Sequence, residues 1–488
     1  MNEPIVGTAA GEVRGRREDG VRAFRGIPYA EPPTGSLRFA APVPRAAWTG
    51  VLDAGDFGPA PVQDTILAAR PSLWNPGDGH DCLTVNLWRP DTEDDGLPVL
   101  VWIYGGAFRM GSSSEPYYDG AALARAGVVL VSLNYRVGFQ GFGSLPDAPE
   151  NRGLLDQLTA LEWVRDNVAS FGGDPGRVTV FGESAGASSV AILLSAPRAK
   201  GLFSRAIASS PASGMADPAQ TVRVTAAIAD ALGRPGTAAG LADVPDADLL
   251  AAQAQAPVAL GSPVPAFVPV IDGETVLAEP AAALAAGHGH PVDLLVGANA
   301  DEATIFTLPL PEEAMDPERL ARALGLDDAG LAAYRELVGE AAGARALHTR
   351  IFSDGLFRMT ALDLARTHAR SGAGRTFRYE LGWPSPALDG ALGACHALDL
   401  PLVFGNLDCP ESHRLLGGPP SRDAAEVSAS MRAAWVAFAT TGAPGPDWPA
   451  TTMAGSPARI IDTPGRIEAG HLDAEAAIWA EHSTRFTH

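Results

Sequence analysis

One stretch decides the fold: Phe171-Gly172-Gly173-Asp174-Pro175-Gly176-Arg177-Val178-Thr179-Val180-Phe181-Gly182-Glu183-Ser184-Ala185-Gly186. It predicts a turn, a short strand over residues 178–181 and a tight corner that carries Ser184. A helix is expected to begin near Ala185 and to run to about Leu194. The last five residues form G-x-S-x-G, the pattern of a serine on a strained turn between a strand and a helix. Glycines flank the serine because the two sides of such a turn approach each other closely.

The beginning of the expected helix would offer unpaired N–H groups beside the Ser184 hydroxyl. These groups and the positive end of the helix dipole favour a negatively charged oxygen at that place. The alternative is a chance pentapeptide in a chain with 54 glycines. The strand directly before the motif and the helix directly after it favour a nucleophile, because that context is the test of the motif.

Charge and composition restrict the partners. The formal net charge is −21, which argues against a nucleic acid or an anionic membrane because both would repel the protein. Cys82, Cys395 and Cys409 are too few for a disulfide framework, and a reducing compartment fits them. The N-terminal residues show no signal-peptide pattern, and no apolar run is long enough to span a membrane. We therefore expect a cytoplasmic protein.

Strands and helices alternate along much of the chain. A β-hairpin with its turn at Glu18-Asp19-Gly20 is expected over residues 4–14 and 21–24. The other expected strands, several of them continuous apolar runs typical of strands covered on both faces, lie at 83–88, 97–104, 128–133, 206–210, 292–297 and 375–381. The expected helices include 120–126, 151–169 and a last one at 423–440. This order predicts βαβ units and a parallel sheet.

The whole chain, residues 1–488, is predicted to be one large α/β domain. No internal repeat and no linker divides it. Three segments are expected to be insertions that shape a pocket: the irregular stretch 56–79 and the mostly helical stretches 216–287 and 311–372.

The remaining members of a catalytic triad are sought downstream of Ser184, because α/β-hydrolases place nucleophile, acid and histidine in that chain order. Asp301 and Glu302 both lie on a loop after a predicted strand, and the residues alone do not separate them. The later histidines are His348, His368, His396, His413, His471, His482 and His488. His396 is favoured because a short loop suits a base that must reach across the top of a sheet, whereas His348 and His368 fall in expected helices.

The chain resembles the type-B carboxylesterases, the family of bacterial para-nitrobenzyl esterases, liver carboxylesterases and cholinesterases. The serine signature of that family is matched at residues 171–186. Its other landmarks are found at 24–30, 80–86, 151–157, 393–405 and 435–438. The resemblance therefore covers nearly the whole chain and implies the α/β-hydrolase fold, with a large, mostly parallel sheet flanked by helices.

The resemblance also implies roles for particular residues. Ser184 would be the nucleophile, His396 the general base and then acid, and Glu302, rather than Asp301, the acid of the triad. The implied oxyanion hole consists of the N–H groups of Gly106, Ala107 and Ala185. Gly105 would support that turn, and Ser210 would be a serine close to the triad.

The sequence departs from the family pattern at several of these places. His80 stands where an acid is usual, Ala303 replaces a glycine after Glu302, Tyr104 replaces a frequent histidine, and Pro211 replaces a glycine after Ser210. The family often pairs the equivalent of Cys82 in a disulfide with an upstream cysteine. No such cysteine exists here, so Cys82 is expected to be a free, buried thiol.

The implied activity is hydrolysis of small-to-medium carboxylic esters through a Ser-His-Glu triad and a covalent acyl-enzyme, by a monomer without metal or organic cofactor. Two alternatives stay open. One is a non-catalytic binding module, against which the complete triad argues. The other is a relative that acts mainly on carbamates or amides or as an acyltransferase, which the same residues would support. Cys409 and His413 suggest half a zinc site, but no second pair of ligands accompanies them.

Overall fold

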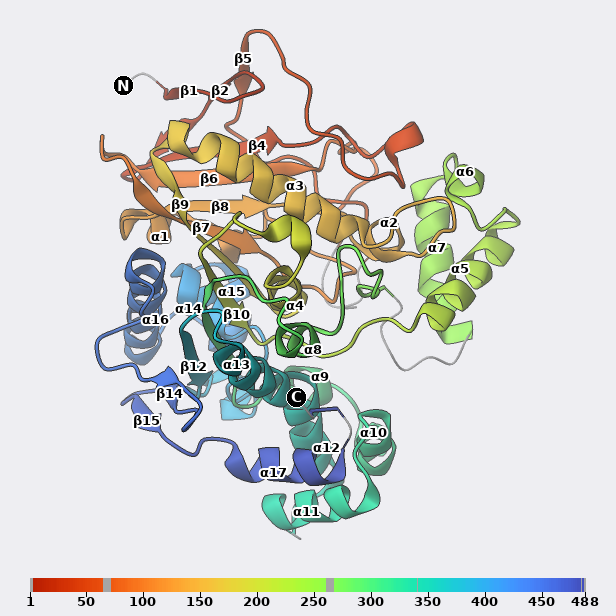
Figure 1. The fold of residues 1–488 in the computed structure, drawn as a ribbon, viewed down its shortest axis with the longest axis vertical. Helices are drawn as coiled ribbons and strands as arrows, with labels where there is room; N and C mark the ends of the chain where they lie inside the picture. The colour runs from red at the N-terminus through yellow and green to blue at the C-terminus, as the bar shows by residue number, and fades with distance from the viewer. Residues whose placement is uncertain (1–2, 65–71, 260–266, 340, 484, 487–488) are drawn as a thin grey trace. The chain divides into compact units, whose positions relative to one another are not determined.

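The computed structural model describes residues 3–64, 72–259, 267–339, 341–483 and 485–486 (Figure 1). The chain divides into two compact units, each built from several segments. The first consists of Met1–Glu115, Asp119–Ser204 and Gly214–Glu279, and the second of Pro116–Tyr118, Arg205–Ser213 and Pro280–His488.

The first unit contains a mixed sheet. Its strands follow one another in the order β9 (Gly173–Glu183), β7 (Leu97–Ile103), β8 (Val129–Leu133), β6 (Thr84–Pro90), β4 (Val21–Pro28) and β3 (Arg16–Glu18). Strand β7 pairs in parallel with both β8 and β9, whereas β8, β6, β4 and β3 pair antiparallel. β7 and β8 are buried almost throughout, as their continuous apolar sequences predict for strands covered on both faces.

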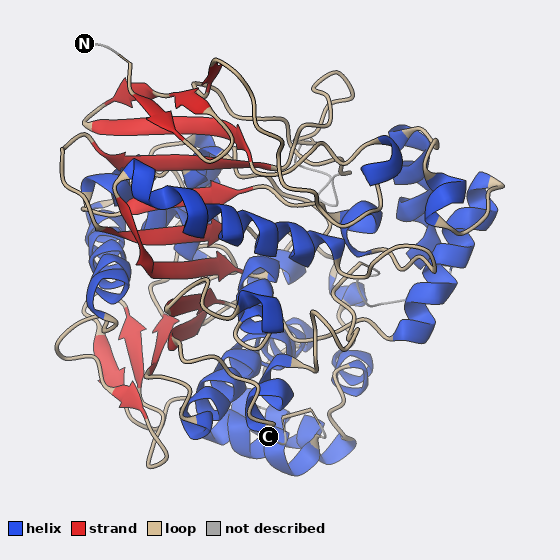
Figure 2. Cartoon of the chain, turned by 45° about the horizontal axis from the view of Figure 1, so that its top comes forward, coloured by secondary structure: helices blue, strands red, loops and turns tan. Residues whose placement is uncertain are grey.

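The first unit also contains seven α-helices within its described residues. They are α1 (Ala121–Arg125), α2 (Gly138–Phe142), α3 (Arg152–Asn167), α4 (Ala185–Leu193), α5 (Pro218–Leu232), α6 (Ala238–Leu241) and α7 (Asp246–Ala259). Figure 2 shows the long helix α3 passing across the strands of this unit. A fully buried ion pair between Arg136 and Asp156 of α3 joins this helix to the segment after β8, with a closest distance of 2.7 Å.

The second unit has its own run of strands. They lie in the order β10 (Arg205–Ser209), β11 (Asp293–Asn299), β12 (Thr376–Leu381), β14 (Ala458–Ile461) and β15 (Arg466–Glu468), with the short β13 (Ala450–Thr451) beside β12. The pairs from β10 to β14 are parallel, and β13 and β15 run antiparallel to their neighbours.

Most of the remaining second unit is helical. Its helices are α8 (Pro280–Ala285), α9 (Thr304–Thr307), α10 (Pro317–Ala323), α11 (Asp328–Val338), α12 (Ala344–Ser353), α13 (Met359–Ser371), α14 (Asp399–Phe404), α15 (Pro410–Leu416), α16 (Arg422–Thr441) and α17 (Asp473–His482). A π-helical turn, Asp354–Arg358, joins α12 to α13. Trp479 of α17 is buried in a core cluster with residues of α10, α11 and α12.

Two sequence expectations about elements are wrong. Residues 4–24 form two hairpins, because a turn closed by a hydrogen bond from Thr8 N–H to the Gly11 carbonyl reverses the chain early and pairs β1 (Ile5–Gly7) with β2 (Glu12–Arg14). Helix α16 is not the last helix, since β13, β14, β15 and α17 follow it. These C-terminal strands have two to four residues, too few for a recognisable alternation of polar and apolar side chains.

The expected insertions are described only in part. Residues 65–71 of the segment 56–79 and residues 260–266 of the segment 216–287 lie outside the described residues. Trp74 is buried against Ala60 and Val62. Segments 216–287 and 311–372 are mainly helical in their described parts, as expected.

Candidate active site

Ser184 occupies a strained corner in the first unit. It lies directly between β9 and α4 with φ 56° and ψ −123°, a conformation that non-glycine residues rarely adopt and that is frequent at functional sites. A Cβ atom on Gly182 would lie 2.5 Å from the backbone of Gly186, and one on Gly186 would lie 2.0 Å from the Ile103 carbonyl oxygen. The two glycines of the motif are therefore required by close backbone contacts.

The loop after β7 runs beside this corner. A Cβ atom on Gly105 would lie 2.9 Å from the Cβ of Ser184, so the loop and the serine are in direct contact. Gly106 and Ala107 have φ values of 108° and 55°, and the Gly106 carbonyl accepts hydrogen bonds from the N–H groups of Arg109 and Met110. This tight turn is the second strained segment next to Ser184.

This half-site contains three backbone N–H groups that can donate hydrogen bonds. Within the part of the chain that the structure describes, the N–H groups of Gly106, Ala107 and Ala185 donate no hydrogen bond. Ala185 is the first residue of α4, where N–H groups have no partner inside the helix and the helix dipole is positive. Such donors can bind an oxyanion.

A second half-site lies in the second unit, where Glu302 contacts His396. A Glu302 carboxylate oxygen lies 2.6 Å from Nδ1 of His396. Glu302 is fully buried and His396 is 7% exposed. The other carboxylate oxygen of Glu302 accepts hydrogen bonds from the Ser210 hydroxyl at 2.5 Å and from the Asn299 N–H at 2.7 Å. An ionised carboxylate only accepts hydrogen bonds, so this contact assigns the proton of the neutral imidazole to Nδ1.

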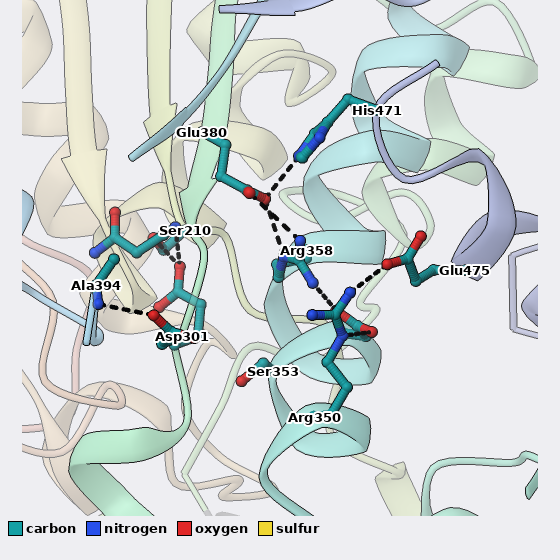
Figure 3. Close-up of polar contacts among 12 residues, drawn as sticks. Ser210, Asp301, Arg350, Ser353, Arg358, Glu380, Ala394, His471 and Glu475 are labelled. Atoms are coloured by element: carbon teal, nitrogen blue, oxygen red, sulfur yellow. Dashed lines mark hydrogen bonds and ion pairs between the residues drawn. The ribbon is translucent and has the colours of Figure 1, made fainter. Parts of the chain in front are cut away.

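Neighbouring residues hold the loop that carries His396. A carboxylate oxygen of Asp301 accepts a hydrogen bond from the Ala394 N–H at 2.9 Å (Figure 3). The Asp301 N–H donates to the Ala394 carbonyl, and the His396 N–H donates to the Glu302 carbonyl. The turn after β11 and the histidine loop are therefore tied together by backbone as well as side chains.

Two buried polar residues of this half-site, Asn299 and Asp399, were not predicted from the sequence. The Asn299 side chain donates to the Cys395 carbonyl at 2.7 Å and lies 3.4 Å from the Asp399 carboxylate. Burial first, and then the nearby Glu302 charge, raises the pKa of Asp399 to about 6. The only sequence signal for these residues is their position at the ends of β11 and of the His396 loop.

The other described histidines that follow Glu302 in the chain have different surroundings. His348 and His368 lie in α12 and α13, as expected, and burial lowers the pKa of His368 to about 4. The acid partners of the others are Asp408 for His413, Glu380 and Glu468 for His471, and Asp327 for His482. His488 lies outside the described residues. His396 is the one that contacts Glu302.

Cys82 is a free, buried thiol, as expected. Burial raises its pKa to about 12, so it is a protonated, inert side chain at neutral pH. Over the described ranges, no group of three or more histidine, cysteine or acidic residues is arranged to hold a metal ion. No helix in those ranges is long and apolar enough to cross a membrane.

Comparison with known proteins identifies the class. Over 98% of this chain and 100% of the other, the structure superimposes on a thermophilic para-nitrobenzyl esterase with a TM-score of 0.89 and 36% identity. A Geobacillus stearothermophilus carboxylesterase is similar over 97% of this chain and 99% of that chain, with a TM-score of 0.86 and 36% identity. The protein therefore has the α/β-hydrolase fold, with a large sheet flanked by helices. The sheet is mixed rather than mostly parallel, because β3, β4, β6 and β8 pair antiparallel.

The sequence comparisons identify the family. Residues 2–479 match the Carboxylesterase family. The chain is 39% identical over 486 residues to the para-nitrobenzyl esterase of Bacillus subtilis, covering 96% of each protein. It is 36% identical over 483 residues to the phenmedipham hydrolase of Pseudarthrobacter oxydans, covering 94% of this chain and 95% of the relative. The chain belongs to the carboxylesterase family and is a carboxylic-ester hydrolase.

Proposed function

We propose that the protein hydrolyses small-to-medium carboxylic esters with Ser184 as nucleophile, His396 as base and Glu302 as the acid of the triad. The observation that carries this proposal is the Glu302–His396 contact of 2.6 Å. With Nδ1 bound to the carboxylate, the lone pair of a neutral imidazole lies at Nε2, where it can accept the proton of a serine hydroxyl.

The proposed reaction has two stages. His396 removes the proton from Ser184 as its oxygen attacks the ester carbonyl, and the N–H groups of Gly106, Ala107 and Ala185 bind the resulting oxyanion. His396 then protonates the departing alcohol. Water activated by the same imidazole cleaves the acyl-enzyme and releases the carboxylic acid. Glu302 stabilises the imidazolium that forms in both stages.

The substrate is proposed to be a soluble aryl or alkyl ester. The first test is hydrolysis of para-nitrophenyl butyrate by the purified protein and by Ser184→Ala. We expect turnover by the wild type and loss of nearly all of it in the variant, with an unchanged melting temperature. A folded wild-type protein that hydrolyses no ester, or one that prefers long-chain triglycerides, would contradict the proposal.

A second experiment tests the covalent intermediate. A fluorophosphonate reacts with an activated serine by forming an oxygen–phosphorus bond and releasing fluoride. We expect mass spectrometry to find the adduct on the peptide that carries Ser184, and to find none in His396→Gln. Parallel assays with a para-nitrophenyl carbamate and an anilide measure how far the same residues act on carbamates and amides.

A further inference from the structure

The imidazole of His396 has aromatic neighbours as well as its acid partner. The ring centroid of Phe357 lies 4.5 Å from that of His396 with an angle of 37° between the planes, and the Phe306 centroid lies 5.3 Å away at 47°. Phe357 is only 3% exposed, whereas Phe306 is 36% exposed. The buried Phe357 ring therefore packs directly against the imidazole. Packing against the two phenylalanine rings restricts the orientation of the imidazole, in addition to the contact of Nδ1 with Glu302.

Phe357 belongs to the π-helical turn Asp354–Arg358 between α12 and α13. Turns of this kind are rare in proteins, and those that occur are often found at functional sites. Two charged residues of the turn, Asp354 and Arg358, are almost fully buried. The Arg358 guanidinium donates to the Asp354 carboxylate four residues earlier, which closes the turn on itself.

An ion cluster anchors this turn to other elements (Figure 3). Arg358 also donates to Glu380 of β12 at 2.9 Å, and Nε2 of His471 lies 3.0 Å from the same carboxylate. Asp354 additionally accepts hydrogen bonds from Arg350 at 2.8 Å and from the Tyr334 hydroxyl at 3.0 Å. Although burial opposes its charge, Arg358 and His471 lower the pKa of Glu380 to about 2, so Glu380 remains ionised at neutral pH.

A buried charged cluster contributes little net stability, because desolvation offsets much of the attraction between buried ions. The cluster instead fixes position, since the hydrogen bonds of the turn to Glu380, Tyr334 and Arg350 hold it relative to β12, α11 and α12. We propose that Phe357 is a positioning residue for His396: the cluster fixes the π turn, and the turn holds the Phe357 ring against the imidazole in the orientation that directs Nδ1 to Glu302. The kinetic part of this inference rests on the proposed function.

The test compares Phe357→Leu and Phe357→Met with Phe438→Leu. Both changes at Phe357 remove the ring, and methionine adapts well to irregular core spaces. Phe438 is a matched control because it is fully buried in α16 of the same unit and packs against Phe377. Kinetics with para-nitrophenyl butyrate and melting temperatures are measured for all three variants. The low-field NMR resonance of the His396 Nδ1 proton, assigned by its absence in His396→Gln, reports the hydrogen bond to Glu302 without substrate.

We expect kcat to fall about ten- to hundredfold in both Phe357 variants, because small errors in the position of catalytic groups have effects of that size. In the same variants, KM should change less than about twofold and the low-field resonance should broaden or disappear. The control Phe438→Leu should lower the melting temperature but retain both kcat and the resonance. An unchanged resonance in folded Phe357→Met, or an equal loss of kcat in Phe438→Leu, would overturn the inference. An inactive wild type with the low-field resonance would instead contradict the proposed function alone.

Discussion

Asp301 and Glu302 are adjacent acids with different partners. Glu302 contacts His396, Ser210 and the Asn299 N–H, whereas the Asp301 carboxylate accepts a hydrogen bond from the Ala394 backbone. One residue is therefore placed to act on the imidazole, and the other holds the loop that carries it. Replacing each acid by its amide should therefore have different effects. An amide oxygen can still accept the hydrogen bond that Asp301 accepts, but it lacks the charge that Glu302 presents to the imidazole.

We expect Glu302→Gln to reduce kcat by about 10²–10⁴-fold, since the loss of the equivalent charge in a serine protease has an effect at the upper end of this range. Asp301→Asn should cost less than about tenfold, because its amide oxygen can still accept the Ala394 N–H. The measurement is steady-state hydrolysis of para-nitrophenyl butyrate by both variants. The opposite ranking would show that Asp301 is the acid.

The close contacts of Gly105 predict that a side chain at this position would lower activity. A Cβ atom at this position would lie 2.8 Å from the Glu183 carbonyl oxygen and 2.9 Å from the Ser184 Cβ. Gly105→Ala should therefore displace the serine and lower kcat by about tenfold or more, as expected for a shift in catalytic geometry. Gly343→Ala is the control, because no atom lies within 4 Å of its added Cβ. Equal activity of Gly105→Ala and wild type would contradict the close contact.

At the scale of elements, buried charges join parts of the second unit that are far apart in sequence. Glu380 lies on β12, Arg358 in the π turn and His471 just before α17. None of these residues has a sequence pattern that predicts its partner. The pairing exists because the chain brings them together in a core where each charge requires an opposite one.

Glu380→Gln is expected to lower the free energy of unfolding by about 3 kcal/mol at neutral pH, because the change leaves Arg358 with one fewer buried carboxylate. The native state lowers the pKa of Glu380 from 4.5 to about 2, so its charge stabilises the fold fully above the unfolded pKa. That stabilisation is lost as the pH falls from about 4.5 to 2.

Urea unfolding of wild type and Glu380→Gln between pH 7 and pH 3 tests this expectation. The difference between the two proteins should shrink as the pH falls, because protonation of Glu380 removes the same charge as the substitution. A difference that is independent of pH would show that the charge of Glu380 does not stabilise the fold.

At the scale of the whole molecule, the formal net charge of −21 on a chain of 50.4 kDa is the dominant feature. Charge of one sign keeps proteins apart through mutual repulsion. We expect a monomer, and light scattering coupled to size-exclusion chromatography should give a mass near 50 kDa at low and at moderate salt. A mass near twice this value at both salt concentrations would contradict the expectation. The cytoplasmic location stays a prediction.

The parts of the fold that could be predicted from the sequence are those encoded by residues adjacent in the chain. The corner at Ser184 was predictable because a β-branched strand, flanking glycines and a small-residue helix are neighbours in the chain, and the structure has β9 and α4 at these positions. The family resemblance, the α/β-hydrolase fold and the ester-hydrolase activity are confirmed by the comparisons. The short strands β14 and β15 were missed because a few residues carry too little periodicity.

The serine corner and the loop that carries His396 were predictable from the sequence because neighbouring residues encode each of them, and the family resemblance over nearly the whole chain predicted the class of protein. The residues alone left Asp301 and Glu302 open, and the family resemblance implied Glu302; in the folded second unit Glu302, and not Asp301, contacts the imidazole. Only the tertiary structure decided that Asn299, Asp399 and Phe357 surround the same site. The physical reason is that side-chain contacts depend on the packing of segments about a hundred residues apart, as for Glu302 and His396.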